Sequence, residues 1–280
     1  MTRPKDLDPS SNPRALLGCE LRHARERAGL SQEALGAPLF VSGSFIGQLE
    51  AGTRRMHLEY AVHFDEVLGT GGFFARNCGA LAKSKYPDHF AEAAEAEAVA
   101  TTIRHYLPLL VPGLIQTPAY SAALFRSYRP MATDEQISEL VATRMDRGCL
   151  MDNPTTPLLW VILDEAALRR PVGGPATMAE ALRHVADLAR RHRIIMQVLP
   201  FSAGAHAGMG GSLKLMEFAD APPLCFIEGL DTGRLIDDPA TVARHSMTFN
   251  LLQALGLPPQ GSLALVDSMA HDYAHEEQHP

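Results

Sequence analysis

Small polar side chains and two arginines stand close together between residues 41 and 55. The stretch VSGSFIGQLEAG, residues 41–52, has apolar residues at helical spacing and fills the positions between them with Ser42, Gly43, Ser44, Gly47 and Gln48. Arg54 and Arg55 follow almost directly. Each glycine costs a helix about 1 kcal/mol relative to alanine, so the bare face indicates that another surface comes close. Ser and Gln hydrogen-bond base edges and Arg binds phosphate, a combination that suits nucleic acid.

The elements around this stretch read as five short helices between residues 13 and 84. The first begins at Pro13, after an asparagine cap, and ends at a glycine. Ser31 caps the second helix, Ser42 caps the third, and Gly52 ends it. Two short helices joined by a tight turn, the second small and polar at its N-terminus, are typical of a helix-turn-helix, whose second helix enters the DNA major groove.

The run LSQEALGAPLFVSGSFIGQLEAGTRR, residues 30–55, resembles the helix-turn-helix of Xre-type regulators, which are relatives of phage repressors. The resemblance implies that Gln32 contacts a phosphate and that Arg54 and Arg55 hold the DNA backbone. It also implies that the groove is faced by Ser42, Gly43, Ser44 and Gln48. Because glycine has no side chain to discriminate bases, direct readout is expected to rest on Ser44 and Gln48.

The turn between the two helices departs from that family pattern. A glycine usually occupies it, where the backbone needs a left-handed conformation, but this chain has Phe40, preceded by Pro38. Phe40 either takes that conformation or extends the turn and plugs the gap between the helices. The alternative to a DNA reader is a helical bundle that only looks like one or has lost DNA binding.

Composition and charge are those of a globular protein with one large or two ordinary domains. The 280 residues are 46% hydrophobic and 20% charged, with no apolar run long enough for a membrane span or signal peptide, so a cytoplasmic, nucleoid-associated protein is expected. The four cysteines lie far apart, which argues against a disulfide framework or zinc site.

The net charge differs between the two halves of the chain. Residues 1–86 hold 11 Lys+Arg and 9 Asp+Glu, a net charge of +2. Since the whole chain has a net charge of −7, residues 87–280 carry −9. An acidic total therefore does not exclude DNA binding, because phosphate attraction is local.

The second half is predicted to be a mixed α/β domain. Residues 88–106 are Ala/Glu-rich and expected to be helical, further helices are expected at 133–150 and 176–191, and two more are expected late in the chain. Four apolar runs read as short strands: PLLWVILD, RIIMQVLP, SLKLMEF and LCFIEGL. The predicted class is α+β: an all-α five-helix domain at 1–86, followed at 87–280 by a domain with a small sheet of four or five strands.

This half resembles the C-terminal domain, of unknown biochemical function, that many actinobacterial Xre-type regulators carry. The resemblance rests on several ordered motifs, among them LDEAALRRPVGGP, IIMQVLPFSAGAHAGMGGSLKLMEF and FIEGL. It implies a transcription regulator, often encoded beside a small partner protein in an antitoxin-like pairing. No catalytic activity is established for such domains, so neither an enzyme nor a cofactor is expected.

Three further patterns contain residue types that could bind a ligand or a metal ion or carry out catalysis. The glycine-rich loop GAHAGMGG, residues 204–211, is expected to contact a partner or ligand through His206, unless this histidine only bonds its own backbone. Asp164 and Glu165 precede Arg169 and Arg170, so capping and ion pairing are expected rather than acid/base catalysis. Spacing by four suits metal ligands, but a disordered polar tail is the favoured interpretation for His271, His275 and His279.

The sequence therefore predicts a DNA-binding transcription regulator that acts as a homodimer on a pseudo-palindromic site, with a C-terminal domain that dimerises and senses a partner or effector. An antitoxin-like protein that sequesters a small partner is the alternative, and an enzyme controlled by its DNA-binding domain is a third. The proline-broken apolar run at residues 107–115 is expected either to pack on its own sheet or to border a surface for a second chain.

Overall fold

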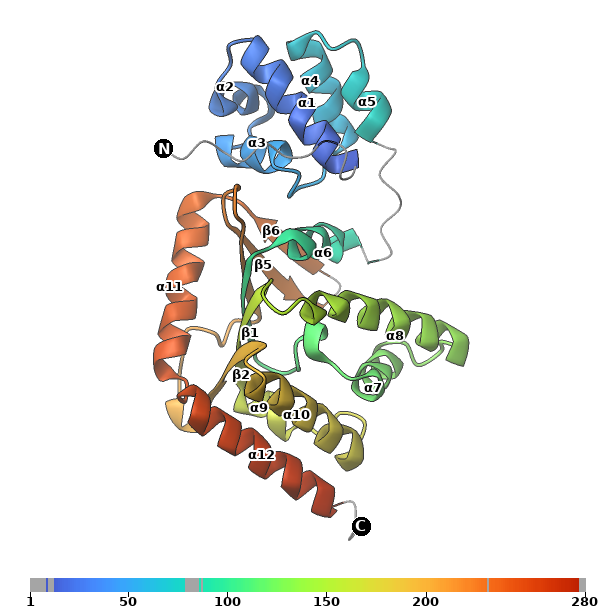
Figure 1. The fold of residues 1–280 in the computed structure, drawn as a ribbon, viewed down its shortest axis with the longest axis vertical. Helices are drawn as coiled ribbons and strands as arrows, with labels where there is room; N and C mark the ends of the chain where they lie inside the picture. The colour runs from blue at the N-terminus through green and yellow to red at the C-terminus, as the bar shows by residue number, and fades with distance from the viewer. Residues whose placement is uncertain (1–8, 10–12, 79–85, 87, 231, 277–280) are drawn as a thin grey trace. The chain divides into compact units, whose positions relative to one another are not determined.

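The computed structural model describes residues 9, 13–78, 86, 88–230 and 232–276, with the elements labelled in Figure 1. The five helices expected in the N-terminal part are confirmed among its described residues. They are α1 (Pro13–Arg27), α2 (Gln32–Gly36), which continues into the 3-10 helix η1 (Ala37–Leu39), α3 (Gly43–Glu50), α4 (Leu58–Leu68) and α5 (Phe73–Cys78). The asparagine expected to cap α1, and the residues that follow α5, lie outside the described part of the chain.

One apolar core holds these five helices together. Each helix is too short to be stable alone, so burial of its apolar face supplies most of its stability. The buried side chains come from all five helices and include Leu21, Leu35, Phe45, Ile46, Leu49, Phe64 and Phe74. The amphipathic spacing in the sequence thus sets which face of each helix turns inward.

The C-terminal part alternates helices and strands. It contains α6 (Asp88–Val99), β1 (Thr102–Leu107), η2 (Gly113–Ile115), α7 (Pro118–Tyr128), α8 (Asp134–Gly148), η3 (Cys149–Asp152), β2 (Leu158–Asp164), α9 (Glu165–Arg169), α10 (Pro175–Arg190), β3 (Ile194–Leu199), η4 (Phe201–Ala203), β4 (Leu213–Glu217), β5 (Leu224–Gly229), β6 (Thr232–Ile236), α11 (Pro239–Leu255) and α12 (Pro259–Glu276).

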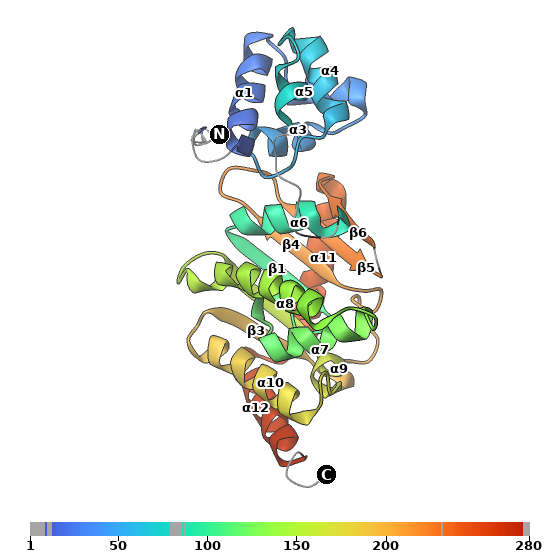
Figure 2. The same cartoon turned by 90° about the vertical axis from the view of Figure 1, so that its right-hand side faces the viewer.

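The strands form a six-stranded sheet in the order β3-β2-β1-β4-β5-β6. β1, β2 and β3 are parallel, with Tyr106 of β1 opposite Ile162 of β2. Helices α7 to α10 make the crossovers between these strands and lie on one side of them, while α11 lies on the other (Figures 1 and 2). The fold class is therefore α+β, as predicted.

Two strands were missed in the sequence. The segment expected to be helical as far as residue 106 turns into strand at Thr102, because the alanine-rich stretch ends and a stretch with β-branched residues begins. β6, with the sequence TGRLI, is short and carries little apolar signal. The sheet consequently has six strands rather than four or five.

The structure also tests the expectations for the apolar run at residues 107–115 and for the C-terminal histidines. Val111, Leu114 and Ile115 are buried, whereas Leu109 is exposed, so the second half of the apolar run at 107–115 packs on its own fold. α12 continues to Glu276, so the expected disordered tail is wrong for His271 and His275; His279 lies outside the described residues. In the part of the chain that the structure describes, no group of three potential metal ligands occurs and no helix is long and apolar enough to cross a bilayer.

Internal contacts divide the chain into two units that do not coincide with 1–86 and 87–280. The first comprises Met1–Ala100, Met216–Phe226 and Leu230–Arg244, and the second comprises Thr101–Leu215, Ile227–Gly229 and His245–Pro280. The boundary at residue 86 stays a prediction.

Candidate nucleic-acid interface

Helices α2 and α3 form the helix-turn-helix that the sequence predicted, and both begin at a serine cap. The Ser31 hydroxyl oxygen accepts a hydrogen bond from the backbone N–H of Ala34 at 3.0 Å, and that of Ser42 accepts from the N–H of Phe45 at 3.1 Å. Each cap satisfies one of the N–H groups that a helix start leaves unpaired. In this role a serine hydroxyl is the acceptor, so the Ser42 O–H remains able to donate to a phosphate or base.

The glycines of α3 serve the packing of α3 on α2. A Cβ at Gly43 would lie 3.2 Å from the backbone nitrogen of Glu33, and a Cβ at Gly47 would lie 3.3 Å from Oε1 of Gln32. The absence of side chains at these two positions therefore lets α2 pack closely against α3. The inference that these glycines give DNA close access is not needed to explain them, although Gly43 still lies at the N-terminus of α3.

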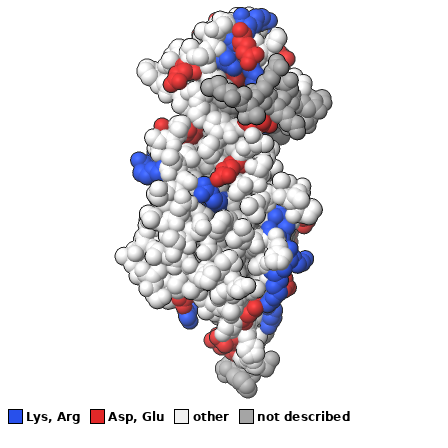
Figure 3. Space-filling view, turned by 60° about the vertical axis from the view of Figure 1, so that its left-hand side comes forward, with Lys and Arg blue, Asp and Glu red and all other residues white. Residues whose placement is uncertain are grey.

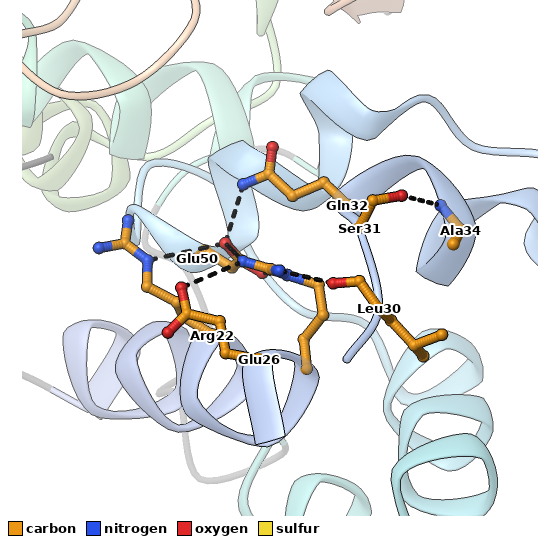
Figure 4. A network of polar contacts seen from close by, with 8 residues as sticks. Arg22, Glu26, Leu30, Ser31, Gln32, Ala34 and Glu50 are labelled. Carbon is orange, nitrogen blue, oxygen red and sulfur yellow. Dashed lines mark hydrogen bonds and ion pairs between the residues drawn. The ribbon is translucent and has the colours of Figure 1, made fainter. Parts of the chain in front are cut away.

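A buried ionic network joins the ends of α1, α2 and α3 (Figure 4). Glu50, at the end of α3, is fully buried. Its carboxylate accepts hydrogen bonds from Nε and Nη2 of Arg25, the latter at 3.0 Å, and from Nε2 of Gln32 at 2.8 Å. Arg25 also donates to the carbonyl oxygen of Leu30 at 2.8 Å. The hydrogen bond to Glu50 raises the pKa of Arg25 despite its partial burial. The network fixes the angle at which α3 leaves α2.

Sequence reasoning missed Arg25 and Glu50. They lie 25 positions apart, and no local spacing rule pairs them. The structure also gives Gln32 a second role. It packs over Gly47 and donates to Glu50, so one of its two amide hydrogens is occupied and the other remains to serve the expected phosphate contact.

The two residues expected to read bases, Ser44 and Gln48, are less exposed than residues on an open helix surface. Ser44 is half-buried, and no described group hydrogen-bonds its hydroxyl oxygen. Gln48 is 0% exposed, and both polar atoms of its amide lack a partner among the described residues. An unpaired buried amide is costly. Base contact by Gln48 stays a prediction that requires its side chain to be uncovered.

The two arginines expected to contact the DNA backbone, Arg54 and Arg55, follow α3 in the chain. Within the first unit, Arg54 pairs with two carboxylates: its Nε lies 3.5 Å from Oε2 of Glu92 and its Nη1 lies 3.2 Å from Oδ2 of Asp237. Its guanidinium also stacks over the Phe45 ring, 4.5 Å from the centroid. Arg55 is half-buried beside it. Phosphate oxygens are the same kind of partner that Arg54 already holds.

Asp65 of α4 holds the start of α5. Its carboxylate accepts hydrogen bonds from the Thr70 hydroxyl and from the backbone N–H groups of Phe74, at 3.0 Å, and Ala75, at 2.8 Å. Burial raises the pKa of Asp65, but these hydrogen bonds outweigh burial, so the pKa lies below its ordinary value. Asp65 is thus a structural anion of the bundle.

Comparison with known protein families agrees with this geometry. Residues 16–72 match a model described as a helix-turn-helix domain, and residues 90–268 match a model described as a domain of unknown function, DUF5753. The second match spans more than half of the chain. The chain belongs to the DUF5753 family. No curated protein and no solved structure matches it. The helix-turn-helix match indicates a DNA-binding regulator, and neither match indicates an enzyme family.

In the DUF5753 part, His206 is engaged with its own fold. Its Nδ1 accepts from the N–H of Gly208 at 3.2 Å, and its Nε2 lies 3.6 Å from Oδ2 of Asp164, which also accepts from the Tyr106 hydroxyl. Burial and Asp164 both raise the pKa of Tyr106. These contacts hold the glycine-rich loop to the sheet, so a ligand or partner role for His206 stays a prediction.

The carboxylate pair at the end of β2 is structural, as expected. Asp164 caps α9 by accepting from the N–H of Ala166 at 2.9 Å, and Glu165 accepts from Nε of Arg169 at 2.7 Å. Glu165 also accepts from the N–H of Phe201 at 2.8 Å. This arrangement uses both carboxylates for positioning the elements at the end of the sheet.

Proposed function

We propose that this DUF5753 protein is a sequence-specific transcription regulator of the Xre type that binds double-stranded DNA as a homodimer. The observation that carries the proposal is the capped α2–turn–α3 pair, whose Ser42 hydroxyl retains a donor at the N-terminus of α3. Gln32 and Arg55 flank that terminus in sequence and supply phosphate contacts. The C-terminal part dimerises and responds to a partner or effector.

Dimerisation is assigned to the exposed face of α11. Met247, Leu251 and Leu255 are spaced by four residues and all are exposed, which makes an apolar stripe along the helix. From His245 to the end of the helix there is no Lys, Arg, Asp or Glu. In Figure 3 the C-terminal part shows a broad area without Lys, Arg, Asp or Glu, with charged side chains around its margins.

A second copy of the chain is the occupant that fits this stripe. In a two-fold interface each surface meets itself, so charged residues near the axis face their own copies and repel. An uncharged helix face avoids that repulsion. Gly208 of the glycine-rich loop packs against Tyr106 and the buried Leu252 of α11, and the next residue of the loop, Met209, is exposed. Two copies paired in this way present two helix-turn-helix units to one DNA site.

The proposal is tested by selecting duplexes from a random 20-base-pair pool with the full-length protein and measuring affinity for the selected and random sequences. Arg55→Ala should weaken binding to both and reduce the slope of log K against log salt by about 0.9, one phosphate contact. Arg126→Ala, which removes an arginine from α7, is the matched control and should change neither value. Recovery of no preferred duplex would contradict the proposal.

The same binding measurement, repeated with the product of a neighbouring small gene, distinguishes a regulator from the antitoxin-like alternative. A protein whose main task is to sequester a small partner should bind the product of a neighbouring small gene more tightly than its selected duplex. A regulator should bind the duplex with or without that protein.

A further inference from the structure

Phe40 occupies a position in the helix-turn-helix where glycine is the ordinary residue. Its backbone is left-handed, with φ 55° and ψ 32°. This conformation ends α2 and η1, because it lets the N–H of Phe40 bond the carbonyl of Ala37 at 3.1 Å and the N–H of Val41 bond the carbonyl of Gly36 at 3.2 Å. The sequence had left open whether Phe40 adopts this conformation, and it does.

The left-handed conformation is unfavourable for phenylalanine. A non-glycine residue with positive φ is uncommon, and a bulky one is an outlier. Only Phe40 and His192 have it among the non-glycine residues that the structure describes. Glycine would take the same conformation without a steric cost, so the backbone geometry does not explain the side chain at this position.

Packing does not explain the side chain either. Leu39 and Val41, on either side, are partly buried against the core of the bundle. Phe40 between them is 98% exposed, the most exposed of the large apolar side chains in the described residues. The sequence-based alternative in which Phe40 plugs the gap between the helices is therefore wrong. A fully exposed aromatic ring held at a steric cost indicates a contact outside the bundle.

The position of Phe40 indicates what that contact is. It precedes Ser42, the N-cap of α3, by two residues, so the two Cα atoms are at most about 7 Å apart. A recognition helix places its N-terminal residues in the major groove. A duplex that hydrogen-bonds Ser42 therefore comes within reach of the Phe40 ring.

Resting on the proposed function, we infer that Phe40 is a DNA-contacting residue whose ring packs on apolar carbon at the groove edge. Two groups of DNA offer such carbon. The thymine C5-methyl group projects into the major groove and accepts apolar contacts from phenylalanine, and the deoxyribose carbons line the flanking backbone. A thymine contact adds base preference, whereas a sugar contact adds affinity for every sequence.

The test compares four full-length variants on duplexes selected with the wild-type protein. Phe40→Gly removes both the ring and the steric cost, so it should weaken DNA binding about fivefold or more while slowing hydrogen exchange in α2 and α3. Phe40→Asn tolerates the left-handed backbone and should lose the same affinity. Phe40→Leu keeps apolar surface and should bind nearly as wild type does. Phe201→Ala removes another exposed aromatic ring and should leave DNA binding unchanged.

Replacing thymine by deoxyuridine in the selected duplex separates the two sources of carbon. If Phe40 contacts a thymine methyl, wild type loses affinity for one substituted position and Phe40→Gly does not. If it contacts a sugar, the loss in Phe40→Gly is equal on selected and random DNA. A Phe40→Gly variant that binds DNA as wild type does, or that changes only the oligomeric state in sedimentation, overturns the inference but leaves the proposed function standing. A wild-type protein that selects no duplex overturns both.

Discussion

Arg25 of α1 donates to both carboxylate oxygens of Glu50 of α3, and the pair is buried at the point where the helix-turn-helix ends. Two parallel charge-assisted hydrogen bonds fix both distance and orientation. Since Gln32 of α2 donates to the same carboxylate, one buried anion sets the arrangement of three helices. The interface for DNA thus depends on residues that do not themselves face it.

Breaking this pair should destabilise the bundle strongly. Arg25→Ala leaves Glu50 buried without its main partner, which costs about 3–5 kcal/mol of unfolding free energy. The double variant Arg25→Met with Glu50→Leu removes both charges and should recover most of that loss. Hydrogen exchange of α1 to α3 measures the effect, while fluorescence of Trp160, the single tryptophan, reports on β2 and should not change. A double variant no more stable than Arg25→Ala would show that the charges themselves are not the cause.

Asp65 predicts a pH dependence of the same bundle. Because its folded-state pKa is lowered, its contribution to stability is complete above the unfolded pKa, near 3.9, and is lost as the pH falls through the lower folded value. Asp65→Asn should cost about 1.5–3 kcal/mol at pH 7 and should make the decline below about pH 4 shallower. Hydrogen exchange of α4 and α5 from pH 5 downward measures this. Glu66→Gln, an exposed neighbour with the same change of charge, should leave the profile unaltered.

The sequence predicted helices whose signals were local. Serine caps at Ser31 and Ser42, Pro13 at the start of α1, and apolar spacing all act within a turn or two, and the structure agrees with them. β1 was missed because its pairing with β2 is a long-range property: Thr102 and Leu158 are partners only once the α7–α8 crossover has formed. The alanine-rich helix α6 directly precedes β1, so the change from helical to strand periodicity was not recognised in the sequence.

The candidate site could be located but not understood from sequence. Position and order sufficed to place α3, yet the meaning of Gly43 and Gly47 depended on what lies opposite them, and that is α2. The burial of Gln48 and the ion pairs of Arg54 likewise depend on contacts with distant residues. Phe40 shows the opposite case, because its departure from the glycine pattern was a usable signal in the sequence itself.

The carboxylates around Arg54 predict a gain-of-binding variant. Arg54 pairs with Glu92 and Asp237, so a DNA phosphate that binds Arg54, as proposed, would compete with these carboxylates for the same guanidinium. Glu92→Gln combined with Asp237→Asn should therefore increase affinity for both selected and random duplexes, by severalfold at low salt and by less at high salt, since screening weakens the competing charges. Titration of labelled duplex at two salt concentrations measures this. Glu135→Gln with Glu139→Gln removes two exposed charges from α8 and controls for net charge; equal gains in both double variants would refute competition at Arg54.

The apolar stripe on α11 predicts a monomer-producing substitution. Leu251 lies between Met247 and Leu255 on the exposed face of α11. Leu251→Glu should place two like charges near the axis of the proposed dimer, so the variant should sediment as a monomer with its fold intact. The control is Met131→Glu, which adds the same charge at another highly exposed apolar position and should remain dimeric.

Loss of the dimer has a defined consequence for DNA binding, and this links the stripe to function. A monomer binds one half-site without the effective concentration that its partner provides, so Leu251→Glu should lose about 10²–10⁴-fold in affinity for a two-half-site duplex. On a duplex with one half-site it should match the wild-type protein, because α2 and α3 are unchanged. If Leu251→Glu is monomeric and still binds the full duplex as tightly as wild type, the α11 face does not join the two DNA-binding units. If it remains dimeric, the second copy is held elsewhere.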